Sequence, residues 1–212
     1  MNHIKAIIFD LDGVICSTDK YHYLAWKQLA DYLGIYFDEK INQKLRGVSR
    51  AESLEIILGE KSSEYTAEEK KTLAEEKNDI YKQYLLQMTP DDLSEETRHT
   101  LEKLRERGYL LAIGSSSKNA RQILMQLGLG YFFDAIADGT QITHSKPNPE
   151  VFLLAASLLG VKPEEALVIE DADSGIQAAY SGEFRAIGIH TSENKPDSEI
   201  SIKRLANLLD IL

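Results

Sequence analysis

The fold of this chain is decided by the stretch IKAIIFDLDG at residues 4–13. Residues 4–9 form a short apolar run, which is typical of a buried strand. Asp10 and Asp12 follow at once, so two carboxylates stand at the carboxyl end of that strand. Because open α/β sheets carry their chemistry at this end, the stretch predicts a reactive site at the tip of the first strand.

Asp10 and Asp12 allow a second interpretation. Two like charges this close repel each other unless a cation lies between them or one of them is protonated. Gly13 permits the sharp turn that a ligand-facing backbone needs. However, Asp-Gly is also an ordinary turn signal, and the first Asp could cap the next element. The fragment alone favours a turn and an active site equally.

Length and charge limit the class of protein. A chain of 212 residues can form one sizeable domain with an insertion, or two small domains. The net charge of −10 argues against nucleic acid or an anionic membrane surface as a partner, because both are themselves negative. The N-terminal apolar run is too short for a signal peptide or a membrane span. We therefore expect a cytoplasmic protein. Because the net charge is negative, a phosphate ligand would have to be attracted by positive charge at its own binding site.

Cys16 is the single cysteine and cannot form an internal disulfide, which fits a reducing compartment. A thiol nucleophile close to Asp10 and Asp12 would need a His and an Asn as partners, and none is evident nearby. We therefore predict that Cys16 is a small packing residue.

A helical pattern fills residues 17–89, where apolar residues recur at the spacing of a helix. Thr66 and Glu69 form a capping box at one helix start, and Pro90 follows the end of the pattern. Helices are expected at residues 21–33, 40–45, 49–58 and 66–88. This four-helix segment is expected to be a cap domain inserted after the first strand, in the position of a lid.

Beyond residue 90 the helices and strands alternate, which predicts βαβ units and a parallel sheet. Asn148 is expected as a helix N-cap, with Pro149 in the first turn and Gly160 beyond the end. Five strands are expected at residues 4–9, 109–114, 135–137, 166–170 and 186–189, with helices between them and a closing segment at 200–212. The fold class is therefore α/β, with a Rossmann-like core domain at 1–16 and 90–212.

Polar residues follow each later strand. They are Ser115 to Asn119, the Ser145-Lys146-Pro147 loop, and Glu170 with Asp171. Each group has an ordinary explanation, because serines and acidic residues cap helices and a loop lysine can be solvated. Their repeated position at strand ends favours a shared site instead.

Phosphoryl transfer needs all of these groups. A carboxylate such as Asp10 can accept a phosphoryl group as an acyl phosphate, which splits one displacement into two. The charge on the transferred group calls for a divalent cation, a fixed ammonium group and neutral donors. Asp10, Glu170 and Asp171 could hold Mg²⁺, while Lys146 supplies the ammonium group and Ser115 the hydroxyl.

These residues resemble, in order, the four motifs of the haloacid dehalogenase-like phosphotransferases. The motifs are Asp10-Leu11-Asp12-Gly13, Ser115, Lys146-Pro147 and Glu170-Asp171. The resemblance implies that Asp10 is the nucleophile and Asp12 the general acid and base. It also implies that Mg²⁺ is held by Asp10, the backbone carbonyl of Asp12, Glu170 and Asp171.

Segments at residues 21–22, 25–27, 47–50, 77–79, 117–119 and 131–138 resemble members that interconvert β-glucose 1-phosphate and glucose 6-phosphate. The resemblance implies a sugar phosphate as partner, β-glucose 1,6-bisphosphate as the activating intermediate, and Arg50 as the clamp on the non-transferring phosphate. The implied substrate-binding residues are Thr18, His22, Trp26, Arg46, Gly47, Val48, Ser49, Arg50, Lys77, Ser116, Ser117, Lys118 and Asn119. Ser17 departs from the family pattern, which has an acidic residue there, and Arg46 stands where a lysine is expected.

Some of these residues could instead have purely structural or surface roles. His22 and Trp26 share a helix face and could simply pack inside the insertion, although the imidazole could also orient Asp12. Lys77 could face solvent. Arg50 could be a surface charge, yet a planar guanidinium beside helix-start amides suits phosphate.

Three functions remain open. A mutase must protect its aspartyl phosphate from water, and closure of a lid on a sugar phosphate would do so. A phosphatase of the same family would use the same four motifs with water as acceptor. A non-catalytic phosphosugar-binding regulator would lack a key residue, but none is missing here. We expect a monomer, because an enclosed site needs no partner chain.

Overall fold

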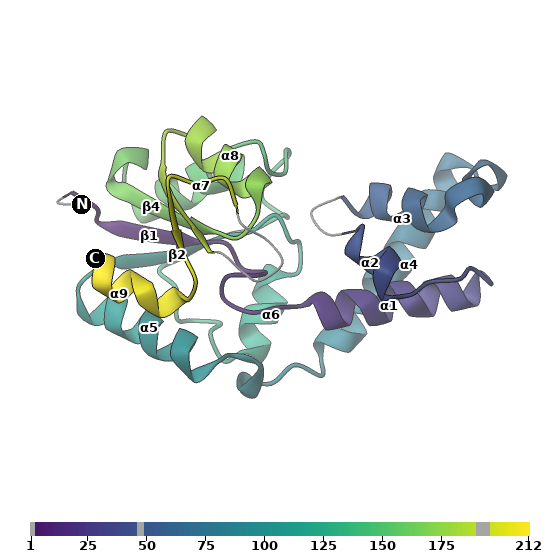
Figure 1. The fold of residues 1–212 in the computed structure, drawn as a ribbon, viewed down its shortest axis with the longest axis horizontal. Coiled ribbons are helices and arrows are strands. Elements are labelled where there is room, and N and C mark those ends of the chain that lie inside the picture. The colour runs from purple at the N-terminus through teal and green to yellow at the C-terminus, as the bar shows by residue number, and fades with distance from the viewer. Residues whose placement is uncertain (1–2, 46–48, 190–195) are drawn as a thin grey trace. The chain divides into compact units, whose positions relative to one another are not determined.

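The computed structural model describes residues 3–45, 49–189 and 196–212 (Figure 1). Its contacts divide the chain into two units. The first, which we call the sheet unit, comprises Met1–Ser17 and Met88–Leu212. The second, the helical unit, comprises Thr18–Gln87.

Within the described residues, the sheet unit contains one parallel sheet of six strands in the order β3-β2-β1-β4-β5-β6. The strands are β1 (Ala6–Phe9), β2 (Leu110–Gly114), β3 (Ala135–Ala137), β4 (Ala166–Glu170), β5 (Arg185–Ile189) and β6 (Ile200–Ile202). The predicted α/β class is confirmed, and β1 lies between β2 and β4. This order is that of the Rossmann fold, whose ligands bind where the strand order reverses.

The sixth strand is a difference from the prediction of five. β6 lies inside the segment expected only to close the chain, and it pairs with β5 through Ile187 and Ile200. Three residues at a sheet edge are too few to show an alternating pattern, so the pairing rather than local sequence defines this strand.

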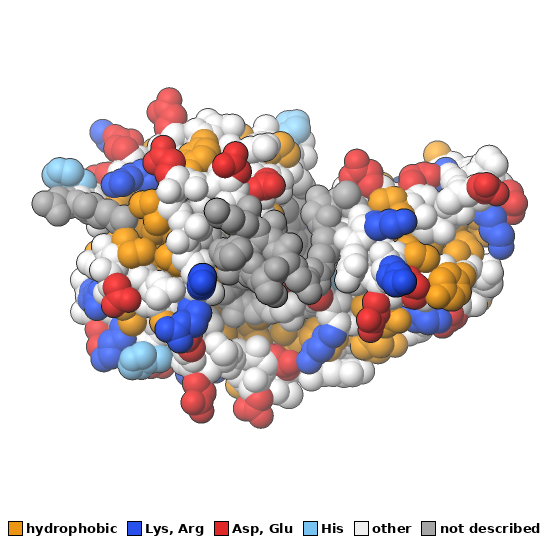
Figure 2. All heavy atoms as spheres, in the orientation of Figure 1, with side chains coloured by type: hydrophobic (Ala, Val, Ile, Leu, Met, Phe, Trp, Pro, Cys, Tyr) orange, Lys and Arg blue, Asp and Glu red, His pale blue; other side chains and the backbone are white. Residues whose placement is uncertain are grey.

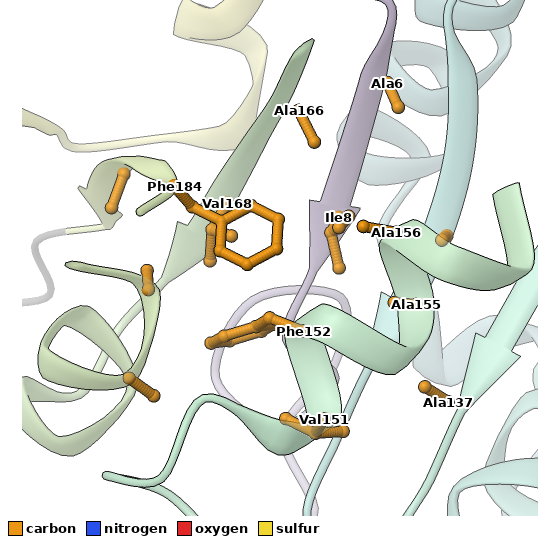
Figure 3. Close-up of a cluster of buried hydrophobic side chains, with 14 of the residues drawn as sticks. Ala6, Ile8, Ala137, Val151, Phe152, Ala155, Ala156, Ala166, Val168 and Phe184 are labelled. Atoms are coloured by element: carbon orange, nitrogen blue, oxygen red, sulfur yellow. The ribbon is translucent and has the colours of Figure 1, made fainter. Parts of the chain in front are cut away.

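Helices cover both faces of the sheet (Figure 1). They are α5 (Glu95–Glu106), α6 (Ala120–Gln126), α7 (Glu150–Leu159), α8 (Asp173–Ser181) and α9 (Leu208–Ile211), with short 3₁₀ turns at Pro90–Asp92, Pro163–Glu165 and Leu205–Asn207. Figure 3 shows Ile8 of β1 and Val168 of β4 beside Phe152 of α7. All three side chains are fully buried, as expected for a sheet covered on both faces.

The start of α7 differs from the prediction by one residue. Pro149, rather than Asn148, is the N-cap, but Oδ1 of Asn148 still accepts a hydrogen bond from the Glu150 N–H at 3.0 Å. Gly160 ends the helix in the left-handed conformation, with φ of 69°, as the sequence indicates.

The helical unit contains α1 (Asp19–Tyr32), α2 (Glu39–Gln43), α3 (Arg50–Leu58) and α4 (Ala67–Leu85), with a 3₁₀ turn at Gly59–Glu64. Thr66 and Glu69 form the predicted capping box at the start of α4. The unit has its own buried apolar cluster, which includes Trp26, Leu54 and Leu73. Among the described residues, no helix is long and apolar enough to cross a membrane. On the face shown in Figure 2, acidic and basic side chains are interspersed.

Candidate active site

The register of the sheet brings Asp10 beside the end of β4. Phe9 pairs with Ile113 of β2 and with Ile169 of β4, and the Asp10 N–H donates to the Ile169 carbonyl at 2.9 Å. Asp10 is therefore one step beyond β1, at the level at which Glu170 ends β4. The carboxyl ends of β1 and β4, which the sequence predicts to share a site, therefore lie side by side.

Lys146 lies between these two carboxylates. Its Nζ donates hydrogen bonds to Oδ1 of Asp10 and, at 2.7 Å, to Oε1 of Glu170. The Lys146 side chain is only 8% exposed, so the alternative of a solvated loop lysine is wrong. Burial opposes its charge, but Asp10 and Glu170 outweigh burial and raise the pKa of Lys146. Lys146 is therefore a fixed ammonium group.

A third carboxylate completes the site. Asp10, Glu170 and Asp171 each offer one oxygen, and these oxygens all lie within 4.8 Å of one another. Burial, followed by the charges of Asp10 and Glu170, raises the pKa of Asp171 to about 8. Burial also raises the pKa values of Asp10 and Glu170, against the opposing effect of Lys146. Crowded carboxylate oxygens of this kind fit a hard divalent cation such as Mg²⁺.

Two glycines make room for this cluster. A Cβ atom on Gly13, whose φ is 89°, would lie 2.1 Å from Oδ2 of Asp171. A Cβ atom on Gly175 would lie 1.8 Å from Oε1 of Glu170. Real Cβ atoms do not come so close, so both carboxylates occupy space that any other residue would fill. The donor set and this cradle together fit a metal site.

Asp12 lies close to the same cluster. It is half-buried and forms an isolated β-bridge with Cys16, and its charge contributes to raising the pKa values of Asp10 and Asp171. Burial, then Asp12 and Asp10, raises the pKa of the buried Cys16 thiol. The packing role predicted for Cys16 is confirmed.

The loop after β2 is held in place by its own serines. Ser115 is 3% exposed, and its Oγ accepts a hydrogen bond from the Ser117 N–H at 3.2 Å. Oγ of Ser117 accepts from the N–H of buried Asn119 at 3.2 Å. Ser116 is half-buried, and its Oγ accepts from the Lys146 N–H at 3.4 Å. The loop is thus joined to the one that carries Lys146. Lys118 is exposed.

A second cluster lies inside the helical unit. Lys77 is 2% exposed, and its Nζ is hydrogen-bonded to Nδ1 of His22 at 2.8 Å. The same Nζ lies 4.7 Å from the ring centre of Trp26 and 4.8 Å from that of Tyr81. His22 stacks on Tyr81, with ring centres 4.1 Å apart. The alternative of a solvent-facing Lys77 is therefore wrong, while Trp26 both packs in the unit and contacts the cation.

Two basic side chains, Lys77 and Arg50, act on each other and on His22 in the second cluster. Burial, then Arg50, lowers the pKa of Lys77 to about 7. Burial, then Lys77 and Arg50, holds the pKa of His22 well below its usual range. Arg50 begins α3 and donates to Oδ1 of Asn78 at 2.8 Å. Among the described residues, Lys77 contacts His22, Trp26 and Tyr81 and no carboxylate, so its ammonium group favours an anion.

The remaining predicted substrate residues lie at helix ends or outside the described residues. Thr18 is the fully buried N-cap of α1. Ser49 is the N-cap of α3 and forms a capping box with Glu52. Arg46, Gly47 and Val48 lie outside the described residues.

Several residues that contribute to these two clusters were not identified from the sequence. Tyr81 follows Lys77 by four positions on one helix, so its place on the same face could have been predicted. Asn78 follows Lys77 directly, but no local pattern indicates its bond to Arg50. Gly175 gives no signal, because its importance depends on where Glu170 points.

The sequence profile of the haloacid dehalogenase-like hydrolases matches residues 4–181. The chain belongs to this family of enzymes. It is 39% identical to a beta-phosphoglucomutase from Bacillus subtilis over 207 residues, which are 97% of this chain and 92% of the relative. It is also 32% identical to a phosphorylated carbohydrates phosphatase from Thermotoga maritima, over 90% of this chain and 88% of the relative.

Solved structures agree with this family. The beta-phosphoglucomutase from Clostridium difficile has a TM-score of 0.85 and is 39% identical, over 97% of this chain and 93% of its own. The similarity covers nearly all of both chains, so it includes the sheet unit and the helical unit.

Proposed function

We propose that this protein is a Mg²⁺-dependent phosphomutase that interconverts β-glucose 1-phosphate and glucose 6-phosphate. The single observation that supports this most strongly is the contact set of Lys146, which joins the carboxylate of Asp10 to Glu170 at the end of β4. A carboxylate with a fixed ammonium group beside it and acidic metal ligands around it is suited to accept a phosphoryl group. The likeness to beta-phosphoglucomutases in both sequence and structure supports the choice of substrate.

In the proposed reaction, one carboxylate oxygen of Asp10 attacks phosphorus and forms an acyl phosphate, while the bond from phosphorus to the donor's oxygen breaks. Asp10, Glu170, Asp171 and the backbone carbonyl of Asp12 would hold Mg²⁺. When bound, the ion would offset the charge of the phosphate that approaches Asp10. Lys146 stabilises negative charge on the transferred group, and Ser115 donates a hydrogen bond to it.

Asp12 moves the proton. In the first step it gives a proton to the oxygen that leaves phosphorus. In the second step it takes a proton from the sugar hydroxyl that attacks the phosphorylated Asp10. Transfer to the 6-hydroxyl of β-glucose 1-phosphate gives β-glucose 1,6-bisphosphate. Return of the 1-phosphoryl group to Asp10 then releases glucose 6-phosphate.

The helical unit would bind the part of the substrate that does not react. Its cluster of Lys77, His22 and Arg50 has the positive charge and the hydrogen-bond donors that a phosphate or sugar hydroxyl requires. We propose that Arg50 holds the non-transferring phosphate, and that Ser117, Lys118 and Asn119 are also substrate-binding residues. We also propose that the helical insertion protects phosphorylated Asp10 from water, which is the role of a lid.

A sugar-phosphate phosphatase is the second candidate, because relatives 32% and 31% identical to this chain are named phosphatases. Both candidates would use Asp10 and Asp12, and they differ in the second acceptor. A non-catalytic regulator is disfavoured, since no nucleophile, ammonium group or metal-type carboxylate is missing from the cluster.

Phosphorus NMR separates the candidates. The protein is incubated with β-glucose 1-phosphate, Mg²⁺ and a trace of β-glucose 1,6-bisphosphate, and with α-glucose 1-phosphate in parallel. The proposal expects glucose 6-phosphate from the β anomer and little product from the α anomer. Release of inorganic phosphate without glucose 6-phosphate would assign the phosphatase function instead.

A further inference from the structure

Glu150, in the first turn of α7, holds the loop that carries Lys146. Its Oε1 accepts the Thr143 N–H at 2.9 Å, and its Oε2 accepts the His144 N–H at 2.8 Å. Nδ1 of His144 lies 3.1 Å from the same Oε2. The carboxylate therefore uses both oxygens to bind two successive backbone amides, two and three residues before Lys146.

The rest of the loop leaves Lys146 little freedom. Asn148 N–H donates to the Ser145 carbonyl at 3.1 Å, and Oδ1 of Asn148 accepts from the Glu150 N–H at 3.0 Å. Thr143 and Asn148, at the two ends of this loop, are therefore both hydrogen-bonded to Glu150, the first residue of α7. The Glu150 pKa is lowered by the same Thr143 and His144 N–H groups, which keeps this carboxylate charged at neutral pH.

Helix α7 also contacts the other end of the Lys146 side chain. Nζ of Lys146 lies 4.6 Å from the ring centre of Phe152, which is fully buried in the core of the sheet unit (Figure 3). A Cβ atom on Gly114 would lie 2.7 Å from Cδ1 of Phe152, so the glycine at the end of β2 provides the space for this ring. One helix start therefore supports the backbone near Lys146 through Glu150 and its ammonium group through Phe152.

We propose that Glu150 is a positioning residue for phosphoryl transfer, which fixes the Thr143–His144 backbone and thereby the place of the Lys146 ammonium group beside Asp10. The proposal rests on the proposed function for its kinetic consequence only. Because a catalytic group must be held within a fraction of an ångström, loosening this loop affects the transition state more than substrate binding.

The test compares Glu150→Gln with Glu95→Gln. Glu95 is likewise an acidic residue in the first turn of a helix of the sheet unit, so both variants remove the same favourable charge from a helix start. Glutamine at 150 has one acceptor oxygen and an NH₂ donor, so it cannot reproduce the arrangement in which each carboxylate oxygen accepts one amide. We expect Glu150→Gln to lower kcat about tenfold with KM nearly unchanged, and Glu95→Gln to change neither.

Two further measurements show whether Glu150 acts through Lys146. In a Lys146→Ala background, adding Glu150→Gln should cause no further loss of kcat, because the group being positioned is gone. Amide hydrogen exchange should become faster at residues 143–146 in Glu150→Gln and stay unchanged in Glu95→Gln. Additive losses, or exchange and kcat equal to those of the control, would overturn the proposal. If no sugar phosphate is turned over by the unmodified protein, the proposed function fails, while exchange still decides whether Glu150 fixes the loop.

Discussion

A Cβ atom on Gly175 would lie 1.8 Å from Oε1 of Glu170. The same Glu170 oxygen accepts a hydrogen bond from Lys146, so any side chain at position 175 must displace a carboxylate that the site already uses. The geometry of the three carboxylates therefore depends on the absence of a side chain at position 175 of α8.

Gly175→Ala should therefore weaken Mg²⁺ binding. We expect the dissociation constant, measured by calorimetric titration, to rise about 10- to 100-fold, because groups that orient metal ligands have effects of this size. Gln177→Ala, an exposed position on the same helix, serves as the control and should bind Mg²⁺ like the unmodified protein. Equal affinities in the two variants would show that Glu170 is not a ligand.

Lys77→Met should stabilise the protein in a pH-dependent way. Burial lowers the pKa of Lys77 from 10.5 to about 7, with Arg50 adding to the effect. Below about pH 7 the folded state carries a charge that is costly to bury. Between pH 7 and 10.5 the unfolded state binds more protons than the folded state, so stability rises with pH and this cost disappears. His22, Trp26 and Tyr81 face the ammonium group, and the two ring contacts offset part of the cost.

Urea unfolding at about pH 6 and at about pH 10 tests this expectation. We expect Lys77→Met to raise the free energy of unfolding by about 2 kcal/mol at the lower pH and by much less at the higher pH. Lys82→Met, a half-buried position on the same helix whose side chain is 43% exposed, should show no such pH-dependent gain. Activity should fall in Lys77→Met, as expected where a binding site is kept at the expense of stability. A destabilised Lys77→Met at pH 6 would contradict the account of this cluster.

Arg50→Lys should affect substrate binding more than turnover. Lysine keeps the positive charge but loses the planar fork, which now donates to Asn78 and would grip the non-transferring phosphate. We expect KM for the sugar phosphate to rise about tenfold with kcat nearly constant. Arg105→Lys, which alters an exposed ion pair with Asp134, is the matched control. A fall in kcat without a change in KM would place Arg50 in another role.

Much of the fold could be predicted because its signals are local. The apolar runs of β3 and β4 are bounded by turn residues, and their predicted limits agree with the structure. The capping box of Thr66 and Glu69 depends on residues three apart, so the start of α4 was also visible in the sequence. β6 was missed because its three residues, Ile200–Ile202, are too few to show a strand pattern.

In the candidate site, likewise, some contacts could be predicted from the sequence and others could not. Asp10 and Lys146 are 136 positions apart, yet both follow strands of a predicted parallel sheet, so their meeting could be expected from topology. The contacts of Glu150 with Thr143 and His144 depend on the path of an irregular loop, which no periodic pattern describes. The depth at which Lys77 is buried depends on how α1 and α4 pack, and a lysine in a charged helix gives no sign of it.

The central claim is that Asp10 carries the phosphoryl group and that a sugar hydroxyl receives it. A pulse of β-glucose 1,6-bisphosphate with a radiolabelled phosphoryl group, given with Mg²⁺, is followed by a chase of unlabelled β-glucose 1-phosphate, with Asp10→Asn as the control. The account predicts label on the peptide that contains Asp10, none on the variant, and passage of that label into sugar phosphate during the chase. Label that never enters the protein, or that leaves it only as inorganic phosphate, would contradict the account.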